Sequence, residues 1–96
     1  MTGGAVYILT NHKHGALYTG VTADIAARMM QHKVGKGSKF CRKYGIDKLV
    51  YLEPAERIGD AIAREKAIKK CRRAWKIELI EKANPDWRDL FFDLNR

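Results

Sequence analysis

The stretch that decides the fold comes early: two apolar segments, VYIL (residues 6–9) and LYTG (17–20), enclose the polar run TNHKHGA (10–16). Both apolar segments are rich in residues that favour β-strands, and the run between them supplies turn residues. The stretch therefore predicts an antiparallel β-hairpin. With its turn centred near His12 and Lys13, it would place Tyr7 directly across from Tyr18, with Cβ atoms about 5 Å apart.

Five further elements are predicted downstream, four of them from hydrophobic periodicity. Apolar residues recur at helical spacing in three segments and alternate in one. Proline cannot continue a helix, which sets the end of the last segment. The expected elements are a helix at 22–33 with Thr22 as its N-cap, one helical turn near 39–43 in a basic loop, a strand at 47–54, a helix from 58 to about 73, and a short helix ending near Asn84 and Pro85.

These elements predict an α+β fold: a small three-stranded antiparallel sheet, formed by the hairpin and a third strand, flanked by helices. A chain of 96 residues has room for one hydrophobic core, so residues 1–96 are expected to form a single domain. No apolar run reaches the roughly 18 residues of a membrane span, and we expect a cytoplasmic protein. Cys41 and Cys71 lack the spacing of a zinc site and are expected to be free thiols.

The composition is strongly basic. Nineteen lysines and arginines stand against eleven aspartates and glutamates, giving a formal net charge of +8 and a pI near 9.7. Such charge on a small body favours a polyanionic partner, most simply nucleic acid. The basic loop at 34–45 is a candidate contact for a nucleic-acid backbone, with a solvated, mobile loop as the alternative. Its GKGSKF segment (35–40) lacks the spacing of a nucleotide-binding P-loop.

Glu65 has an unusual position in the predicted helix from residue 58. It lies three residues after Ile62 and three before Ile68, within the apolar stripe. A buried carboxylate must be paired, hydrated in a cleft or bound to a metal ion, because burying it alone is very costly. The pattern leaves open whether Glu65 forms a salt bridge with a basic neighbour or carries a function.

Arg28 and His32 lie one turn apart on the predicted helix at 22–33. They offer a cation beside a titratable group. On spacing alone, an ordinary surface pair is the alternative.

Taken together, these residues resemble the GIY-YIG nuclease superfamily, in particular its small single-domain bacterial members. The two motifs that give the superfamily its name correspond to VYI (6–8) and YTG (18–20). Its Arg-x-x-x-His helix matches Arg28 and His32, and its single metal-binding glutamate matches Glu65. The resemblance covers almost the whole chain.

The resemblance implies metal-dependent hydrolysis of a phosphodiester bond, with one divalent cation, Mg²⁺ or another such as Mn²⁺, held by Glu65, water and a phosphate oxygen. Arg28 would offset charge on the scissile phosphate, and Tyr18 would position the phosphate or water. One tyrosine, by the family pattern Tyr7, would take a proton from the attacking water. With an ordinary pKa near 10, it needs nearby cations or a relay to His32 for this role.

The function expected is a DNA endonuclease, structure-selective or linked to repair, with DNA favoured over RNA as the partner. A targeting protein is a further expected partner, and the sequence leaves the oligomeric state open. The alternatives are a non-catalytic nucleic-acid-binding module that keeps the fold, and an adaptor whose basic surface meets an acidic protein. The residues expected to contact nucleic acid are Lys36, Lys39, Arg42, Lys43, Lys69 and Arg72, and Asn84 is a further candidate for the site.

Overall fold

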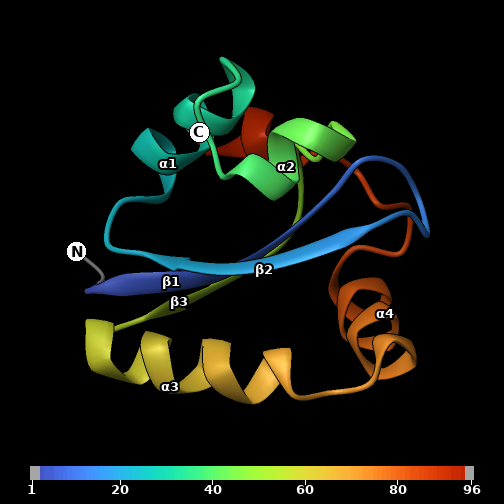
Figure 1. Ribbon diagram of the computed structural model, residues 1–96. Coiled ribbons are helices and arrows are strands. Elements are labelled where there is room, and N and C mark those ends of the chain that lie inside the picture. The colour runs from blue at the N-terminus through green and yellow to red at the C-terminus, as the bar shows by residue number, and fades with distance from the viewer. Residues whose placement is uncertain (1–2, 95–96) are drawn as a thin grey trace.

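Three antiparallel strands form the centre of the fold in the computed structural model, which describes residues 3–94 (Figure 1). They are β1 (Gly4–Thr10), β2 (Leu17–Thr22) and β3 (Lys48–Ala55), in the order β2-β1-β3. The hairpin and the third strand thus share one sheet, with β1 in the middle and β2 at an edge. The predicted α+β fold class is confirmed.

Helices cover both faces of the sheet (Figure 1). On one face, called the upper face here, lie α1 (Ile25–Lys33), α2 (Lys39–Tyr44) and the 3-10 helix η1 (Leu90–Asp93). On the opposite, lower face lie α3 (Ile58–Lys69) and α4 (Arg73–Ala83). Within residues 3–94, no helix is long and apolar enough to cross a membrane.

The alternation of side chains along β1 divides the core into two layers. Val6 and Ile8 point to the lower face, where they pack with residues of α3 and α4. Tyr7 and Leu9 point to the upper face, where they pack with Met29 of α1. Every residue of β1 is buried, so the strand fixes which face each of its side chains can reach.

The register of the hairpin differs from the prediction. Tyr7 pairs with Gly20 and Tyr18 pairs with Leu9, so the strands are shifted by two residues from a direct pairing of the tyrosines. The turn is centred on Lys13 and His14, one residue later than predicted: the Gly15 N–H donates to the His12 carbonyl at 2.8 Å, and His14 has a left-handed φ of 59°. Because side chains alternate with a period of two, this shift keeps both tyrosines on the upper face.

Two helix ends also differ from the prediction. Asp24 caps α1, since its side chain accepts a hydrogen bond from the backbone N–H of Ala27 at 3.1 Å, whereas Thr22 is the last residue of β2. α3 ends at Lys69, and a new helix begins at Arg73.

The basic loop is more ordered than a single helical turn. α2 occupies six of its residues, and the Ser38 side chain caps it by accepting from the backbone N–H of Cys41 at 3.2 Å. Cys41 is the buried residue of α2 and Cys71 is partly exposed, and both are free thiols, as predicted.

Candidate active site

Tyr7 of β1 and Tyr18 of β2 lie side by side on the upper face. They are diagonal neighbours in the antiparallel pair, with ring centroids 6.4 Å apart and ring planes inclined by 41°. The residue across from Tyr7 is Gly20, where a Cβ would lie 2.5 Å from the Tyr7 hydroxyl oxygen. The glycine of the second motif therefore leaves the space that the Tyr7 side chain occupies.

Arg28 of α1 completes a polar contact with this pair. The buried Met29 holds α1 on the sheet, and Arg28 Nε donates to Tyr7 Oη at 3.3 Å. Arg28 Nη1 donates to Gln31 Oε1 at 2.8 Å. Over residues 3–94, no carboxylate forms a salt bridge with Arg28. Its positive charge is therefore available to an anion.

His32 lies one turn farther along α1, against both tyrosines. Its ring centroid is 6.1 Å from that of Tyr7 and 6.0 Å from that of Tyr18. The residue is only 5% exposed, yet neither ring nitrogen has a hydrogen-bond partner within the described chain. His32 also lines a pocket of about 270 Å³ between α1 and α2, whereas the two tyrosines do not line this pocket.

The protonation states of these groups follow from their burial. Burial raises the pKa of Tyr7 above 10, although the hydrogen bond and charge of Arg28 oppose this change. Burial also lowers the pKa of His32 below 6.5, and the charge of Arg28 acts in the same direction. The hydrogen bond to Tyr7 raises the pKa of Arg28. At neutral pH the site therefore combines a phenol, a neutral imidazole and a cation.

Glu65 belongs to α3, which packs against the lower face of the sheet. Its side chain projects from the buried side of α3, between Ala61 and Ile68, which pack under the sheet. Its burial is confirmed, at 8% exposure, but Ile58 and Ile62 are 40% and 39% exposed, so the buried stripe is rotated from the predicted one. The sheet lies between the helix that carries Glu65 and the helix that carries the arginine and histidine (Figure 1).

The partner of Glu65 is Lys69, whose Nζ lies 2.6 Å from Glu65 Oε2. Magnesium keeps several waters in proteins and uses one or two carboxylates plus substrate phosphates, so a single glutamate has suitable chemistry. No group of three potential His, Cys, Asp or Glu ligands occurs in residues 3–94. The donor therefore fits an ion that binds together with substrate.

The basic residues expected to contact nucleic acid divide between the two faces. From Ile25 to Ile46 the chain contains no aspartate or glutamate, while arginines and lysines recur through α1, the following loop and α2. This segment gives the upper face a continuous positive charge. It contains Lys36, Lys39, Arg42 and Lys43, all exposed, whereas Lys69 and Arg72 lie at the junction of α3 and α4 on the lower face.

Asn84 has a structural role. Its side-chain nitrogen donates to the carbonyls of Val50 and Arg88, at 3.0 and 2.9 Å, and its side-chain oxygen accepts from the N–H of Arg88 at 3.1 Å. These bonds tie the end of α4 to β3, and the residue is 5% exposed. Both amide hydrogens are used, so Asn84 offers no free donor to a substrate.

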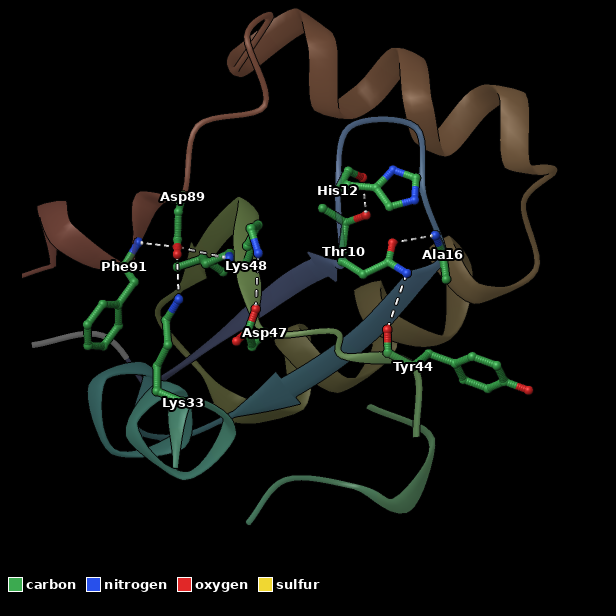
Figure 2. Close-up of polar contacts among 11 residues, drawn as sticks. Thr10, His12, Ala16, Lys33, Tyr44, Asp47, Lys48, Asp89 and Phe91 are labelled. Carbon is green, nitrogen blue, oxygen red and sulfur yellow. Dashed lines mark hydrogen bonds and ion pairs between the residues drawn. The ribbon is translucent and has the colours of Figure 1, made fainter. Parts of the chain in front are cut away.

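Asp89 supports the site, and the sequence did not single it out (Figure 2). Its Oδ1 accepts from the N–H groups of Leu49 and Phe91, each at 3.1 Å, and its Oδ2 binds the ammonium of Lys33 at the end of α1. One carboxylate thus joins α1, β3 and the C-terminal segment. Its only local signal is its place as the N-cap of η1, because Lys33 and Leu49 are 56 and 40 residues away.

The chain is similar to known proteins over most of its length. A family model described as the GIY-YIG catalytic domain matches residues 3–78. The chain belongs to the GIY-YIG family. The matched region includes all five residues to which the resemblance gives chemical roles. The family is one of nucleases, and its substrate is nucleic acid.

Relatives of this GIY-YIG chain carry the name UPF0213 protein. One from Syntrophus aciditrophicus (strain SB) is 40% identical over 87 residues, which are 90% of this chain and 98% of the relative. One from Clostridium perfringens is 44% identical over 75 residues, 78% of this chain and 80% of the relative. The solution NMR structure of a UPF0213 protein from Bacillus halodurans is 31% identical, with a TM-score of 0.56, and the match covers 90% of each chain. The protein is therefore a small GIY-YIG protein of the UPF0213 type.

Proposed function

We propose that this protein is a metal-dependent endonuclease that hydrolyses phosphodiester bonds in DNA, in structure-selective or repair-related reactions, and that residues 1–96 act as one domain. The observation that carries the proposal is the cation of Arg28, which contacts Tyr7 but no carboxylate in residues 3–94. A guanidinium in this state is suited to a phosphate oxygen, which it binds through charge-assisted hydrogen bonds.

The upper-face residues divide the chemical work. Arg28 binds the scissile phosphate and offsets the negative charge that develops in the transition state. Tyr7 and Tyr18 orient the phosphate and the attacking water. His32 is neutral at pH 7 and has ring nitrogens without protein partners in the described chain, so it accepts the proton that the water loses, directly or through a tyrosine hydroxyl. Because burial raises the pKa of Tyr7, we assign the proton to the imidazole in preference to the phenol.

Glu65 is the residue proposed to hold the divalent ion, Mg²⁺ or Mn²⁺, which when bound supplies positive charge that stabilises a phosphate. Lys69 Nζ contacts Oε2 of the same carboxylate at 2.6 Å, so Lys69 competes with an ion for that oxygen. The Lys69 side chain is 51% exposed whereas that of Glu65 is 11% exposed, so separating the pair returns the ammonium to water and leaves the carboxylate to the ion.

Binding rests on phosphate contacts from the basic residues, of which those on α2 and its preceding loop lie nearest the cluster. Such contacts position the nucleic acid without reading its sequence, and they weaken steeply with added salt. Selection of a physiological substrate is therefore assigned to DNA structure or to a targeting protein.

The direct test is incubation of the purified protein with labelled single-stranded, duplex and flapped DNA and with RNA, in magnesium or in a chelator. We expect cleavage of DNA in magnesium only, and loss of cleavage in Tyr7→Phe and Glu65→Gln proteins purified in parallel. An inactive Tyr7→Phe sample, purified in the same way, would show that the preparation contains no contaminating nuclease. Magnesium-dependent cleavage that then survives Glu65→Gln would remove Glu65 from the mechanism.

The second candidate function is a non-catalytic nucleic-acid-binding module with the GIY-YIG fold. Two observations favour it: Glu65, on a helix that packs on the opposite face of the sheet from α1, is paired with Lys69, and burial raises the pKa of Tyr7. This alternative predicts salt-sensitive DNA binding with no cleavage in magnesium or manganese.

A further inference from the structure

A row of aromatic rings leads from the candidate active site onto α2. Tyr18 stacks with Phe40 at a centroid distance of 6.5 Å and an interplanar angle of 28°, and Phe40 contacts Tyr44 at a centroid distance of 5.0 Å. We call Tyr18, Phe40 and Tyr44 the aromatic row. Phe40 and Tyr44 are four residues apart, so they share one side of the helix.

The outer part of the aromatic row is open to solvent. Phe40 and Tyr44 are 45% and 47% exposed, although both are large side chains that a small protein ordinarily buries. Single exposed apolar residues are common, but adjoining exposed rings that continue into a candidate active site form a patch suited to binding.

Positive charge accompanies the aromatic row. Lys39, Arg42 and Lys43 belong to the same helix as its two exposed rings, and Lys43 Nζ lies 5.3 Å from the centroid of the Tyr44 ring. No acidic residue occurs in the sequence from residue 25 to residue 46. A surface of aromatic rings interleaved with lysine and arginine complements a strand of unpaired nucleotides, which offers base faces and phosphates together.

The hairpin loop holds this helix in place. Asn11 Nδ2 donates to the backbone carbonyl of Tyr44 at 3.2 Å, and Asn11 Oδ1 accepts from the N–H of Ala16 at 3.1 Å. In Figure 2 the Tyr44 carbonyl faces the hairpin loop, while the Tyr44 ring points away from the sheet. The exposed ring therefore extends from an anchored backbone and not from a free loop.

We propose that the aromatic row is a stacking platform for unpaired bases, which delivers a single strand, or an unpaired branch of DNA, to the tyrosine and arginine cluster. The proposal rests on the proposed function and names its substrate class. In a duplex the base faces are covered by their neighbours, so only unpaired bases can stack on Phe40 and Tyr44. The lysines and arginine of α2 hold the phosphates of the same strand.

The test measures binding without cleavage. Fluorescence anisotropy in chelator compares three labelled probes of equal length: single-stranded oligo-dT, a duplex, and an abasic strand that keeps the phosphates but lacks bases. Stacking of one base contributes about 1–3 kcal/mol, so we expect Phe40→Ala and Tyr44→Ala each to weaken oligo-dT binding about 5- to 150-fold. Binding of the abasic strand should change less than twofold.

Two matched variants serve as controls. Trp75→Ala removes a ring that is 40% exposed on α4 and should leave oligo-dT binding unchanged. Phe40→Tyr keeps an aromatic face and should bind oligo-dT as the parent protein does.

Two results would each overturn the inference. The first is oligo-dT binding that survives Phe40→Ala and Tyr44→Ala, which would leave the aromatic row to a protein partner. The second is an equal loss of binding for oligo-dT and for the abasic strand. Selective binding of oligo-dT without cleavage in magnesium would instead overturn the proposed function and leave the aromatic row as a single-strand site.

Discussion

The two faces of the sheet each hold a tyrosine near an arginine, and they use the pair differently. On the lower face, Tyr51 Oη donates to Glu53 at 2.7 Å, and Arg64 Nε donates to the same carboxylate at 3.0 Å. On the upper face, Arg28 donates directly to Tyr7, with no carboxylate salt bridge to Arg28 in the described chain. A carboxylate cancels the charge of the lower arginine, whereas the upper arginine keeps its charge for a ligand.

The contrast teaches that the residue types alone do not distinguish a structural contact from a reactive one. Burial raises the pKa of both tyrosines, but the carboxylate of Glu53 adds to the effect at Tyr51, whose pKa rises to about 12, while the charge of Arg28 opposes it at Tyr7. The difference lies in the carboxylate of Glu53, which joins the tyrosine and arginine on the lower face and has no counterpart beside Arg28 among the described residues.

The largest expected difference between the faces is in catalysis. Arg28→Ala should lower the DNA cleavage rate about 100- to 1,000-fold, the range for removing one donor to a developing negative charge. Arg64→Ala should leave cleavage unchanged and lower the free energy of unfolding by about 1 kcal/mol or less, because its ion pair is partly exposed. Cleavage assays and urea denaturation of both variants measure the two effects. Equal losses of cleavage would show that the faces do not differ as described.

Two glycines, one on each side, sharpen the comparison. Gly20→Ala would place a Cβ 2.5 Å from the Tyr7 hydroxyl oxygen, so the tyrosine must move. We expect cleavage to fall at least about tenfold and the free energy of unfolding to fall by about 1–3 kcal/mol. Gly59→Ala in α3 meets no atom within 4 Å and should raise stability by about 0.5–1 kcal/mol without affecting cleavage. A Gly20→Ala protein with normal cleavage would contradict the tight packing at Tyr7.

The lower face should respond to alkali. The folded pKa of Tyr51 is raised to about 12, above its ordinary value near 10. The protonated phenol therefore contributes to the free energy of unfolding in full below pH 10, and this contribution is lost as the pH rises through 12. The loss attributable to Tyr51 should approach roughly 2–3 kcal/mol. Urea denaturation across this range should show a shallower decline in Tyr51→Phe than in the parent protein. Parallel declines would contradict the burial of the phenol.

The upper face should respond, more weakly, to acid. The folded pKa of His32 lies below 6.5 because of burial and the charge of Arg28, while the charge of Asp47 acts in the opposite direction. The contribution of His32 to stability is therefore present above pH 6.5 and is lost as the pH falls through the folded pKa. Denaturation below pH 6.5 should be less pH-dependent in His32→Gln. Cleavage by the parent protein should decline over the same acidic range as the imidazole becomes charged.

Local patterns predicted most of the fold. The strand propensities of β1 and β2, the alternation in β3 and the periodicity of α1 and α3 are properties of neighbouring residues, and each element was found. The register was wrong because the turn depends on the left-handed conformation of His14, which no single residue type announces. The placement of both tyrosines on one face was nevertheless predictable, since a shift of two residues preserves the face of a strand, whereas their grouping with Arg28 and His32 was expected only from the family resemblance.

Glu65 shows the limit of what hydrophobic periodicity can predict. Its spacing from Ile68 predicted that it is buried, and it is, but periodicity states only that a side faces the sheet. Which face of the sheet receives α3 is a property of the whole chain. Asp89 shows the same limit, because its partners on α1 and β3 are distant in sequence.

The contacts of Asp89 with Lys33, Leu49 and Phe91 determine how far the domain can be shortened. The family match ends at residue 78, so a piece of chain cut there would retain every residue to which we assign chemistry. It would lose the carboxylate that binds Lys33 at the end of α1, the helix that carries Arg28 and His32. Any minimal version of this domain must therefore extend past residue 89, into a tail that the family pattern does not cover.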